Sequence, residues 1–286
     1  MNRREFVRTT ALSAGILSLP PFASSALPSS RVKKASDEVI LGKTGLKVTR
    51  LAIGTGTSGW NGQSNQTRSL GIQGLASLLQ YAYDQGIRFW DSADQYGTHP
   101  HLREGLKYVP REKVVILTKT HASTREEMKA DLDRFRSEIG TDYIDIVLLH
   151  CMLDENWPVR KKGAMDYLSE AREKGIIKAH GVSCHTLKAL KTAAANDWVQ
   201  IDLARINPTG DNMDADVPTV MPILKKMKAD GKGIIGMKIF GGGSLTNRVD
   251  ECLRFILNQN YVDSFTIGVE SREQLQEILR KIPELS

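Results

Sequence analysis

The chain has few cysteines and, beyond its first thirty residues, no long apolar run. Its three cysteines, Cys151, Cys184 and Cys252, are too few and too scattered for a disulfide framework or a zinc site. No stretch after the start of the chain approaches the roughly 18 apolar residues that a membrane-spanning helix needs. We therefore expect no stable insertion of the mature protein into a membrane.

The sequence also lacks an arginine-rich tract, and aromatic residues make up only 6% of it. The formal net charge of +6 comes from Lys and Arg residues that are interleaved with Asp and Glu. Nucleic-acid binding favours basic clusters, whereas an interleaved pattern is typical of a solvated surface. We expect no nucleic-acid partner. A chain with 41% hydrophobic and 25% charged residues has the balance of a soluble globular protein.

Residues 1–30 differ in composition from the rest of the chain. Arg3 and Arg4 precede Phe6, an apolar run spans Thr9–Leu19, and two prolines lead to small residues that continue through Ala26. A charged start, a short apolar middle and a small-residue exit indicate an export signal. The arginine pair followed by Phe resembles the twin-arginine type. We expect residues 1–30 to be signal and linker, cleaved near Ala26, and the twin-arginine machinery to deliver the protein to the bacterial periplasm.

From residue 39 onward, a short apolar run, a stretch of helical periodicity and a Gly or polar break alternate. The runs recur about 24 to 37 residues apart, the spacing of parallel strands joined by crossover helices. Eight runs follow this pattern: Leu51–Gly54, Ile87–Asp91, Val114–Lys119, Ile144–His150, Ala179–Ser183, Leu203–Asn207, Ile234–Phe240 and Ser264–Gly268. Eight such units favour an α/β fold, a single (β/α)8 TIM barrel over residues 31–286, rather than an open doubly wound sheet. Gly54–Gly59 matches the dinucleotide-binding glycine pattern only loosely.

Local signals refine this architecture. Val39–Val48, with its turn at Lys43-Thr44-Gly45, predicts a hairpin that closes the bottom of the barrel. Ser123 and Glu126 have the spacing of a capping box, which would begin a helix ending at Gly140. The apolar face of that helix would be Met128, Leu132, Phe135 and Ile139. Ser271 and Gln274 repeat the capping signal before the last helix.

Four polar side chains that can carry a proton lie at or just after three consecutive predicted strands: Asp91, Tyr96, Lys119 and His150. Active sites of β/α barrels form at the carboxyl ends of the strands, so we expect these groups to meet. A lysine beside a tyrosine lowers the phenol pKa, and an aspartate keeps that lysine charged. Singly, each has a structural alternative: a helix cap, a loop contact, a surface charge and a structural histidine. None supplies electrons, so the chemistry is either acid–base alone, as in a lyase or epimerase, or a redox step with a hydride-carrying cofactor.

The segments around these residues resemble the aldo-keto reductases. They are Leu41–Val48, Phe89–Gly97, Thr118-Lys119 and Leu148–His150, in the family's order and spacing. The resemblance implies hydride transfer between a nicotinamide cofactor and an aldehyde, ketone or alcohol. It also implies that Tyr96 is the general acid, that Lys119 and Asp91 tune it, and that His150 positions the carbonyl.

Cofactor residues follow from the resemblance less directly. Ser183 stands where the family binds the nicotinamide amide, but Cys184, Leu203 and Met237 replace the expected Asn, Gln and Tyr. These departures leave open a cofactor-bound barrel that senses redox state or binds partners with negligible turnover.

Candidate phosphate-binding residues follow the seventh predicted strand. Gly241, Gly242 and Gly243 would let backbone N–H groups approach phosphate oxygens, although a flexible turn is the alternative. Lys238 would bind a cofactor phosphate or extend to the barrel rim. Glu270, Arg272 and Gln274 lie in the segment that resembles the family's adenosine site. Glu270 favours a ribose hydroxyl and Arg272 a 2′-phosphate, so we expect NADP, with NAD possible.

The substrate pocket and the thiols yield further expectations. Trp60 and Trp157, with His99 or His121, would line the pocket. A short Cys151–Val159 loop and a chain that ends soon after its last helix predict a shallow, permissive pocket. Cys151 and Cys184, at adjacent strand ends, could form a disulfide in an oxidising compartment, although inert thiols are the alternative. His99 and His101 lie two residues apart in a loop, and this spacing is only weak evidence for a metal site. Substrate identity, reaction direction and oligomeric state are left open.

Overall fold

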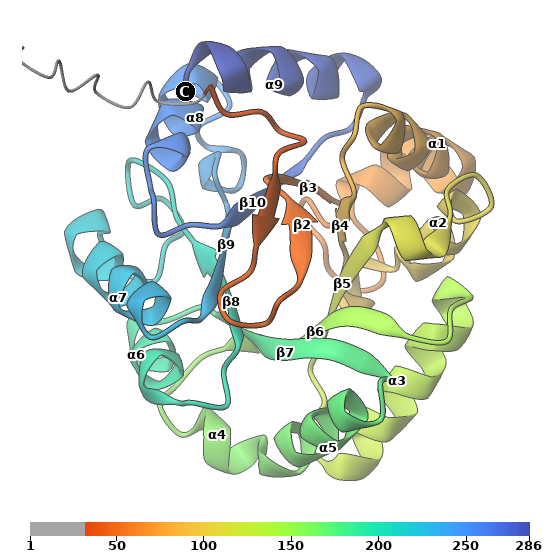
Figure 1. Ribbon diagram of the computed structural model, residues 1–286, viewed down its shortest axis with the longest axis vertical. Coiled ribbons are helices and arrows are strands. Elements are labelled where there is room, and N and C mark those ends of the chain that lie inside the picture. The colour runs from red at the N-terminus through yellow and green to blue at the C-terminus, as the bar shows by residue number, and fades with distance from the viewer. Residues whose placement is uncertain (1–31) are drawn as a thin grey trace, which may run out of the picture. The chain divides into compact units, whose positions relative to one another are not determined.

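Eight parallel strands close into a barrel, with helices outside it (Figure 1). The computed structural model describes residues 32–286, so the predicted export signal lies outside the described residues. The strands adjoin in the order β10-β3-β4-β5-β6-β7-β8-β9. Their bounds are β3 (Leu51–Gly54), β4 (Phe89–Asp91), β5 (Val115–Thr120), β6 (Ile144–Met152), β7 (Ile177–Cys184), β8 (Ile201–Arg205), β9 (Gly233–Met237) and β10 (Ser264–Gly268). The predicted (β/α)8 fold is confirmed.

Helices follow the strands along the chain. The α-helices are α1 (Asn65–Asp84), α2 (His99–Gly105), α3 (Arg125–Ile139), α4 (Trp157–Arg160), α5 (Lys162–Glu173), α6 (Leu187–Ala195), α7 (Val217–Ala229), α8 (Val249–Leu257) and α9 (Arg272–Glu284). Three 3-10 turns are η1 (Asp94–Tyr96), η2 (Arg111–Lys113) and η3 (Gly241–Gly243). Within residues 32–286, none of these helices combines the length and the apolarity needed to cross a membrane.

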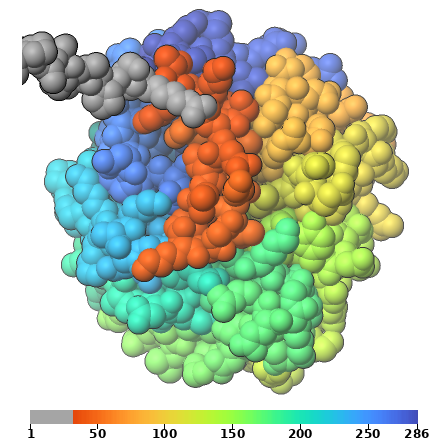
Figure 2. Space-filling view, viewed as in Figure 1, coloured from red at the N-terminus to blue at the C-terminus, as the bar shows by residue number. Residues whose placement is uncertain are grey.

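The predicted hairpin is present as β1 (Glu38–Ile40) and β2 (Lys47–Thr49), which pair antiparallel with Val39 opposite Val48. The Lys43 N–H donates to the carbonyl of Gly231, just before β9 begins, so the hairpin lies at the amino ends of the strands. Figure 2 shows this segment covering the middle of that face. The hairpin therefore closes one end of the barrel and leaves the carboxyl ends of the strands for a site.

The core has an inner and an outer layer, as strand alternation requires. The inner cluster fills the barrel with apolar side chains from β3 to β9, among them Phe89, Leu117, Ile146, Leu148, Ile201 and Leu203. The outer cluster packs the helices against the strands. The same alternation places Asp91, Lys119, His150 and Arg205 on the inner side at the open end, two residues beyond Phe89, Leu117, Leu148 and Leu203.

Several predicted boundaries were wrong by one or two residues. The capping box of α3 is formed by Thr124 and Glu127 instead of Ser123 and Glu126, because the Glu127 carboxylate accepts the N–H groups of both Ser123 and Thr124. Gly140 ends α3 in a left-handed conformation, as predicted.

The last three strands before β10 also differ from their predicted limits. β7 begins at Ile177, two residues earlier than expected, and β8 is shifted by two residues. Asn207 lies beyond β8, where its side-chain amide donates to the carbonyls of Asp211 and Lys238. β9 ends at Met237, because Lys238 has a left-handed φ of 58° and turns the chain out of the sheet.

Candidate active site

Lys119 and Asp91 form a buried ion pair at the open end of the barrel. Lys119 ends the inner face of β5 and is 1% exposed. Its Nζ donates to Oδ1 of Asp91 at 2.5 Å and to the carbonyl of Ser92 at 2.7 Å. A buried ammonium requires such partners, because an unpaired charge in the interior is strongly unfavourable.

The Tyr96 ring lies against this pair. Nζ of Lys119 is 4.8 Å from the centroid of the ring, which η1 presents just after β4. On its other side, the ring touches the β3–α1 loop so closely that a Cβ at Gly56 would come within 2.1 Å of it and one at Gly59 within 2.2 Å. These two glycines allow the loop to close over the tyrosine. Sequence reasoning missed this role, although the glycine-rich loop after the first strand was visible.

Charge and burial act on the two groups in opposite directions. Burial raises the pKa of Tyr96 above its usual value, and the Lys119 ammonium opposes that rise without cancelling it. Burial alone would lower the pKa of Lys119, but the Asp91 carboxylate and Tyr96 outweigh it, so the lysine pKa is raised. Lys119 lowers the phenol pKa, as predicted, but burial outweighs it. Tyr96 is a neutral proton donor beside a permanently charged ammonium.

His150 completes the group. It lies on the inner face of β6, edge-on to Tyr96 with ring centroids 5.8 Å apart, and His121 stacks on it at 4.8 Å. Burial and the nearby Lys119 charge hold its pKa well below the usual value, so the imidazole is neutral. Its Nδ1 is buried without a hydrogen-bond partner in residues 32–286. The structure thus brings all four predicted residues together, with a neutral imidazole beside the phenol.

A cavity of about 240 Å³ begins at Asp91 and Tyr96 and runs past the ends of β9 and β10. Its lining comes from the ends of β3, β4, β9 and β10 and the loops that follow them: Gly54, Gly56, Thr57, Ser58, Asp91, Tyr96, Met237, Lys238, Ile239, Phe240, Gly242, Gly243, Thr246, Thr266, Ile267 and Gly268. The lining joins the proton donor Tyr96 to the loop after β9, so it fits a cofactor that reaches both. Thr57, Phe240 and Thr246 were not predicted, since their position depends on how the loops fold.

The far part of the cavity has the features of a phosphate cradle. Gly242 and Gly243 have positive φ values of 72° and 115°, which non-glycine residues rarely adopt. A Cβ at Gly242 would lie 3.7 Å from Nζ of Lys238, so the ammonium lies directly against the turn. No side chain or carbonyl in residues 32–286 accepts a hydrogen bond from that Nζ. An unpartnered ammonium beside an open glycine turn fits a phosphate group.

The loop after β8 supports this turn. Asn212 Nδ2 donates to the carbonyl of Gly241 at 2.7 Å, and Ser244 Oγ donates to Asp211 at 2.7 Å. Gly241 is buried, its N–H donates to the carbonyl of Lys238, and it does not line the cavity. Its predicted role as a direct ligand was therefore wrong: it shapes the turn, whereas Gly242 and Gly243 face the space.

The remaining predicted cofactor residues lie outside the cavity lining. Oγ of Ser183 accepts the N–H of Cys151. Glu270 accepts the side-chain amide of Asn65, at the start of α1, and Gln274 accepts the N–H of Glu270.

Arg272 is also engaged elsewhere. It donates to Ser77 and lies over the Tyr81 ring, so it contacts α1. The side chains of these four predicted residues are therefore bound to other parts of the protein itself: Ser183, Glu270, Gln274 and Arg272.

The predicted substrate residues lie in different surroundings, and only some of them are near the site. Trp60 is 72% exposed in the β3–α1 loop, close in sequence to the glycines that cover Tyr96. Trp157 is 1% exposed, packs in the outer core and directs its indole N–H to the carbonyl of Ala189, so a place in the pocket wall was the wrong prediction. His121 stacks on His150, whereas His99 is buried between Glu138 and Thr118.

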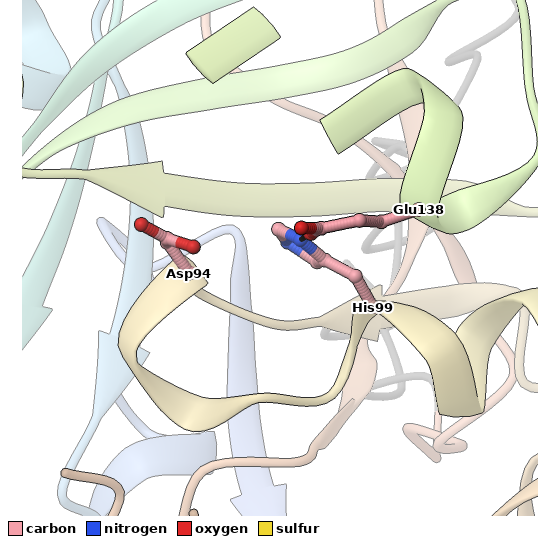
Figure 3. A group of neighbouring side chains, drawn as sticks. All are labelled: Asp94, His99 and Glu138. Carbon is pink, nitrogen blue, oxygen red and sulfur yellow. Dashed lines mark hydrogen bonds and ion pairs between the residues drawn. The ribbon is translucent and has the colours of Figure 1, made fainter. Parts of the chain in front are cut away.

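His99 belongs to a group of three possible metal ligands with Asp94 and Glu138 (Figure 3). His99 Nδ1 is 2.7 Å from Glu138, and its Nε2 is 2.7 Å from Oγ1 of Thr118. Arg134 donates to both carboxylates. Both ring nitrogens are engaged and the Arg134 guanidinium already pairs with both acids, so the cluster is a hydrogen-bonded contact between α2 and α3.

The three cysteines are free in the structure. Cys184 faces outward into the core between strands and helices, whereas Cys151 lies in an irregularity of β6 with a positive φ of 61°. The possible disulfide between Cys151 and Cys184 is not formed in the structure, in keeping with the alternative of free thiols.

Comparison with known proteins decides the family. The model of the Aldo/keto reductase family matches residues 50–251. The chain belongs to this family. Membership makes it an NAD(P)-dependent oxidoreductase that acts on carbonyl or alcohol groups.

Individual family members are distant. D-threo-aldose 1-dehydrogenase from a Pseudomonas species is 23% identical over 244 residues, which cover 74% of this chain and 71% of the relative. Versiconal hemiacetal acetate reductase from Aspergillus parasiticus is 30% identical over 199 residues, or 55% of each chain. A probable aldo-keto reductase from Glycine max is 29% identical, and this chain spans 50% of its length.

Solved structures of aldo-keto reductases share the fold. A putative aldo-keto reductase from Pseudomonas aeruginosa superposes with a TM-score of 0.73 at 22% identity, covering 90% of this chain and 99% of that one. The Bombyx mori aldo-keto reductase in complex with NADP has a TM-score of 0.64 at 18% identity, covering 86% and 87%. The solved structures of this family therefore share the barrel fold described above.

Proposed function

We propose that this aldo-keto reductase uses NADPH to reduce an aldehyde or ketone to an alcohol, or catalyses the reverse reaction, with Tyr96 as the proton donor. One observation carries the proposal: the Tyr96 ring, set against the Lys119–Asp91 pair, stands at the edge of a cavity that ends at Lys238 and two open glycines. That combination supports a proton donor and a phosphate-binding turn that serve one cofactor.

The residues act as follows. The bound nicotinamide supplies the hydride. A neutral His150 donates one ring N–H to the substrate carbonyl oxygen and fixes its position. As negative charge develops on that oxygen, the Tyr96 O–H transfers its proton to it. The phenolate that forms is stabilised by the Lys119 ammonium, which Asp91 and the Ser92 carbonyl hold in place.

The favoured cofactor is NADP. Lys238 and the backbone N–H of Gly242 would bind phosphate oxygens, whereas the N–H of Gly243 already donates to the carbonyl of Phe240. Met237 and Phe240 border the same cavity. NAD is the alternative, since Glu270 could accept from a ribose hydroxyl and Arg272 already contacts α1. Fluorescence titrations with NADPH and NADH would decide. A large preference for NADH would contradict the choice of NADP.

The test of activity is a screen of aldehydes, ketones and quinones with each reduced cofactor. We expect loss of the near-ultraviolet absorbance of the reduced nicotinamide with several small aldehydes, because the β6–α4 loop is short and Trp60 is exposed. Tight cofactor binding with no turnover on any compound would instead support a redox-sensing or partner-binding barrel. The departures at Cys184, Leu203 and Met237 give that alternative its basis.

We also propose export through the twin-arginine machinery to the periplasm. The composition of residues 1–30 supports this, and the cofactor would then be loaded before export. In a bacterial host, the wild-type protein should appear in the periplasm with its amino terminus near residue 27. Replacement of both Arg3 and Arg4 with Lys should retain it, uncleaved, inside the cell. An uncleaved wild-type chain in the cytoplasm would contradict the proposal.

A further inference from the structure

A second cationic group lies at the barrel mouth, beyond the four residues used above. Arg205 is the last residue of β8 and pairs in register with Met237, the β9 residue that lines the cavity. Ile201 and Leu203 of the same strand face the barrel interior, so alternation directs Arg205 inward at the open end. Its guanidinium therefore lies beside the cavity and on the same side of the barrel wall as Lys119 and His150.

The guanidinium is held by Asp214, but not all of its N–H donors are used. Its Nε donates to Oδ1 of Asp214 at 3.0 Å and its Nη2 donates to the same oxygen. Nη1 has no hydrogen-bond partner in residues 32–286. The Arg205 side chain is 12% exposed and that of Asp214 is 1% exposed, so the aspartate anchors the arginine from behind. One edge of the guanidinium is left to face the mouth.

Besides its partner Asp214 and the nearby Lys238 ammonium, Arg205 has neutral polar neighbours. His185 directly follows β7, and burial together with the charges of Arg205 and Lys238 lowers its pKa to about 4. Burial raises the pKa of the Cys151 thiol, which also lies within reach of the Arg205 charge. Neither side chain carries charge near neutral pH. An anion entering here would therefore meet the guanidinium with uncharged hydrogen-bonding groups beside it.

The distance to the reacting centre suits a small molecule. β6 and β8 are separated by one strand, which gives a lateral spacing of about 10 Å, and the register places Arg205 two residues farther along its strand than the position level with His150. The backbones at His150 and Arg205 are therefore roughly 12 Å apart. Both side chains reach inward from there. A carbonyl at Tyr96 and His150 could thus share one short carbon chain with an anionic group at Arg205.

We propose that Arg205 determines specificity by binding the anionic end of the substrate, so that the preferred substrate is a short aldehyde or ketone carrying a carboxylate or phosphate. The inference rests on the proposed carbonyl reduction and adds the substrate class. Arginine presents N–H donors in a planar arrangement that matches these anions. Lys238, in contrast, lies against the glycine turn and serves the cofactor end of the cavity.

The test compares matched substrates on the NADPH-loaded full-length protein. Succinate semialdehyde is set against its methyl ester, and glyceraldehyde 3-phosphate against glyceraldehyde, so that carboxylate and phosphate are distinguished. We expect kcat/KM to be about tenfold or more higher for at least one anionic partner, mainly through KM. Arg205→Gln should bring that ratio near one, and Arg205→Lys should restore part of it. Arg280→Gln, at an exposed position on α9, should leave the ratio unchanged.

Two further measurements separate the possible failures. The double variant Arg205→Gln/Asp214→Asn avoids a buried unpaired carboxylate, and it should lose the preference as the single variant does. NADPH affinity should stay unchanged in Arg205→Gln; a weaker affinity would assign Arg205 to the cofactor and overturn the inference. Reduction of both partners at equal efficiency by the wild type would also overturn it while leaving carbonyl reduction intact. No reduction of any compound would reject the proposed function, and the inference with it.

Discussion

Oδ1 of Asp91 lies 2.5 Å from Nζ of Lys119, and both side chains are almost fully buried at the open end of the barrel. The pair therefore places a fixed positive charge beside the Tyr96 ring. The Lys119 ammonium is shielded from water and fixed in position, so it can stabilise a phenolate at Tyr96.

Removal of that charge should affect both activity and stability. Lys119→Met would leave the phenolate without its counter-charge, so we expect kcat for reduction to fall at least about 100-fold. It would also leave Asp91 buried and unpaired, which should lower the free energy of unfolding by about 3–5 kcal/mol. Denaturant titration and steady-state kinetics measure the two effects. Lys129→Met, on the exposed face of α3, serves as control and should change neither.

The close contact between the β3–α1 loop and the Tyr96 ring predicts that a substitution in the loop lowers activity although it removes no polar group. A Cβ at Gly56 would come within 2.1 Å of the Tyr96 ring, so Gly56→Ala must displace either the loop or the phenol. We expect kcat to fall at least about tenfold, because small misplacement of a proton donor is costly. Gly105→Ala adds a Cβ at an ordinary contact distance of 3.4 Å and should be neutral. Equal activity of the two variants would show that Tyr96 needs no such fit.

The pH dependence of reduction follows from the directions of the pKa shifts. Tyr96 must be protonated to donate, and burial raises its pKa above the usual value, which extends the protonated range upward. His150 acts as a neutral group, and burial lowers its pKa, so it is already neutral at about pH 6.5. We therefore expect kcat for reduction to be nearly constant from about pH 6.5 to 9 and to fall only near or above pH 10. A fall centred near pH 7 would contradict the assignment of Tyr96 as a buried acid.

The cofactor cradle predicts a separable effect on binding. Lys238→Met removes the ammonium that lies against Gly242, and we expect the Kd for NADPH to rise at least about tenfold. The reaction at saturating cofactor should retain most of its rate, since Lys238 is not near the transferred proton. Lys226→Met, on the exposed side of α7, should bind NADPH like the wild type. Unchanged affinity in Lys238→Met would move the phosphates to another part of the cavity.

The sequence predicted the barrel because short continuous apolar runs alternated with helical stretches at regular spacing. It also predicted the grouping of Asp91, Tyr96, Lys119 and His150, because the carboxyl ends of parallel strands converge in a barrel. These inferences need only local periodicity and one general rule about topology.

Other features depend on tertiary packing that periodicity does not encode. The contact of Gly56 and Gly59 with the Tyr96 ring joins two loops far apart in the chain. Arg205 went unnoticed because β8 was placed two residues too late, which put this strand end in the middle of a run. Trp157 was assigned to the pocket from its position in a loop, but its large apolar surface is buried between helices.

The most direct measurement is the comparison of Tyr96→Phe with the wild type, with NADPH binding and reduction measured on the same preparations. The substitution removes one hydroxyl and keeps the ring that Gly56 and Gly59 cover. We expect Kd for NADPH to remain within about twofold, and kcat for an aldehyde that the wild type reduces to fall at least about 1,000-fold. Retention of substantial turnover by Tyr96→Phe would show that another group donates the proton and would contradict the proposed mechanism.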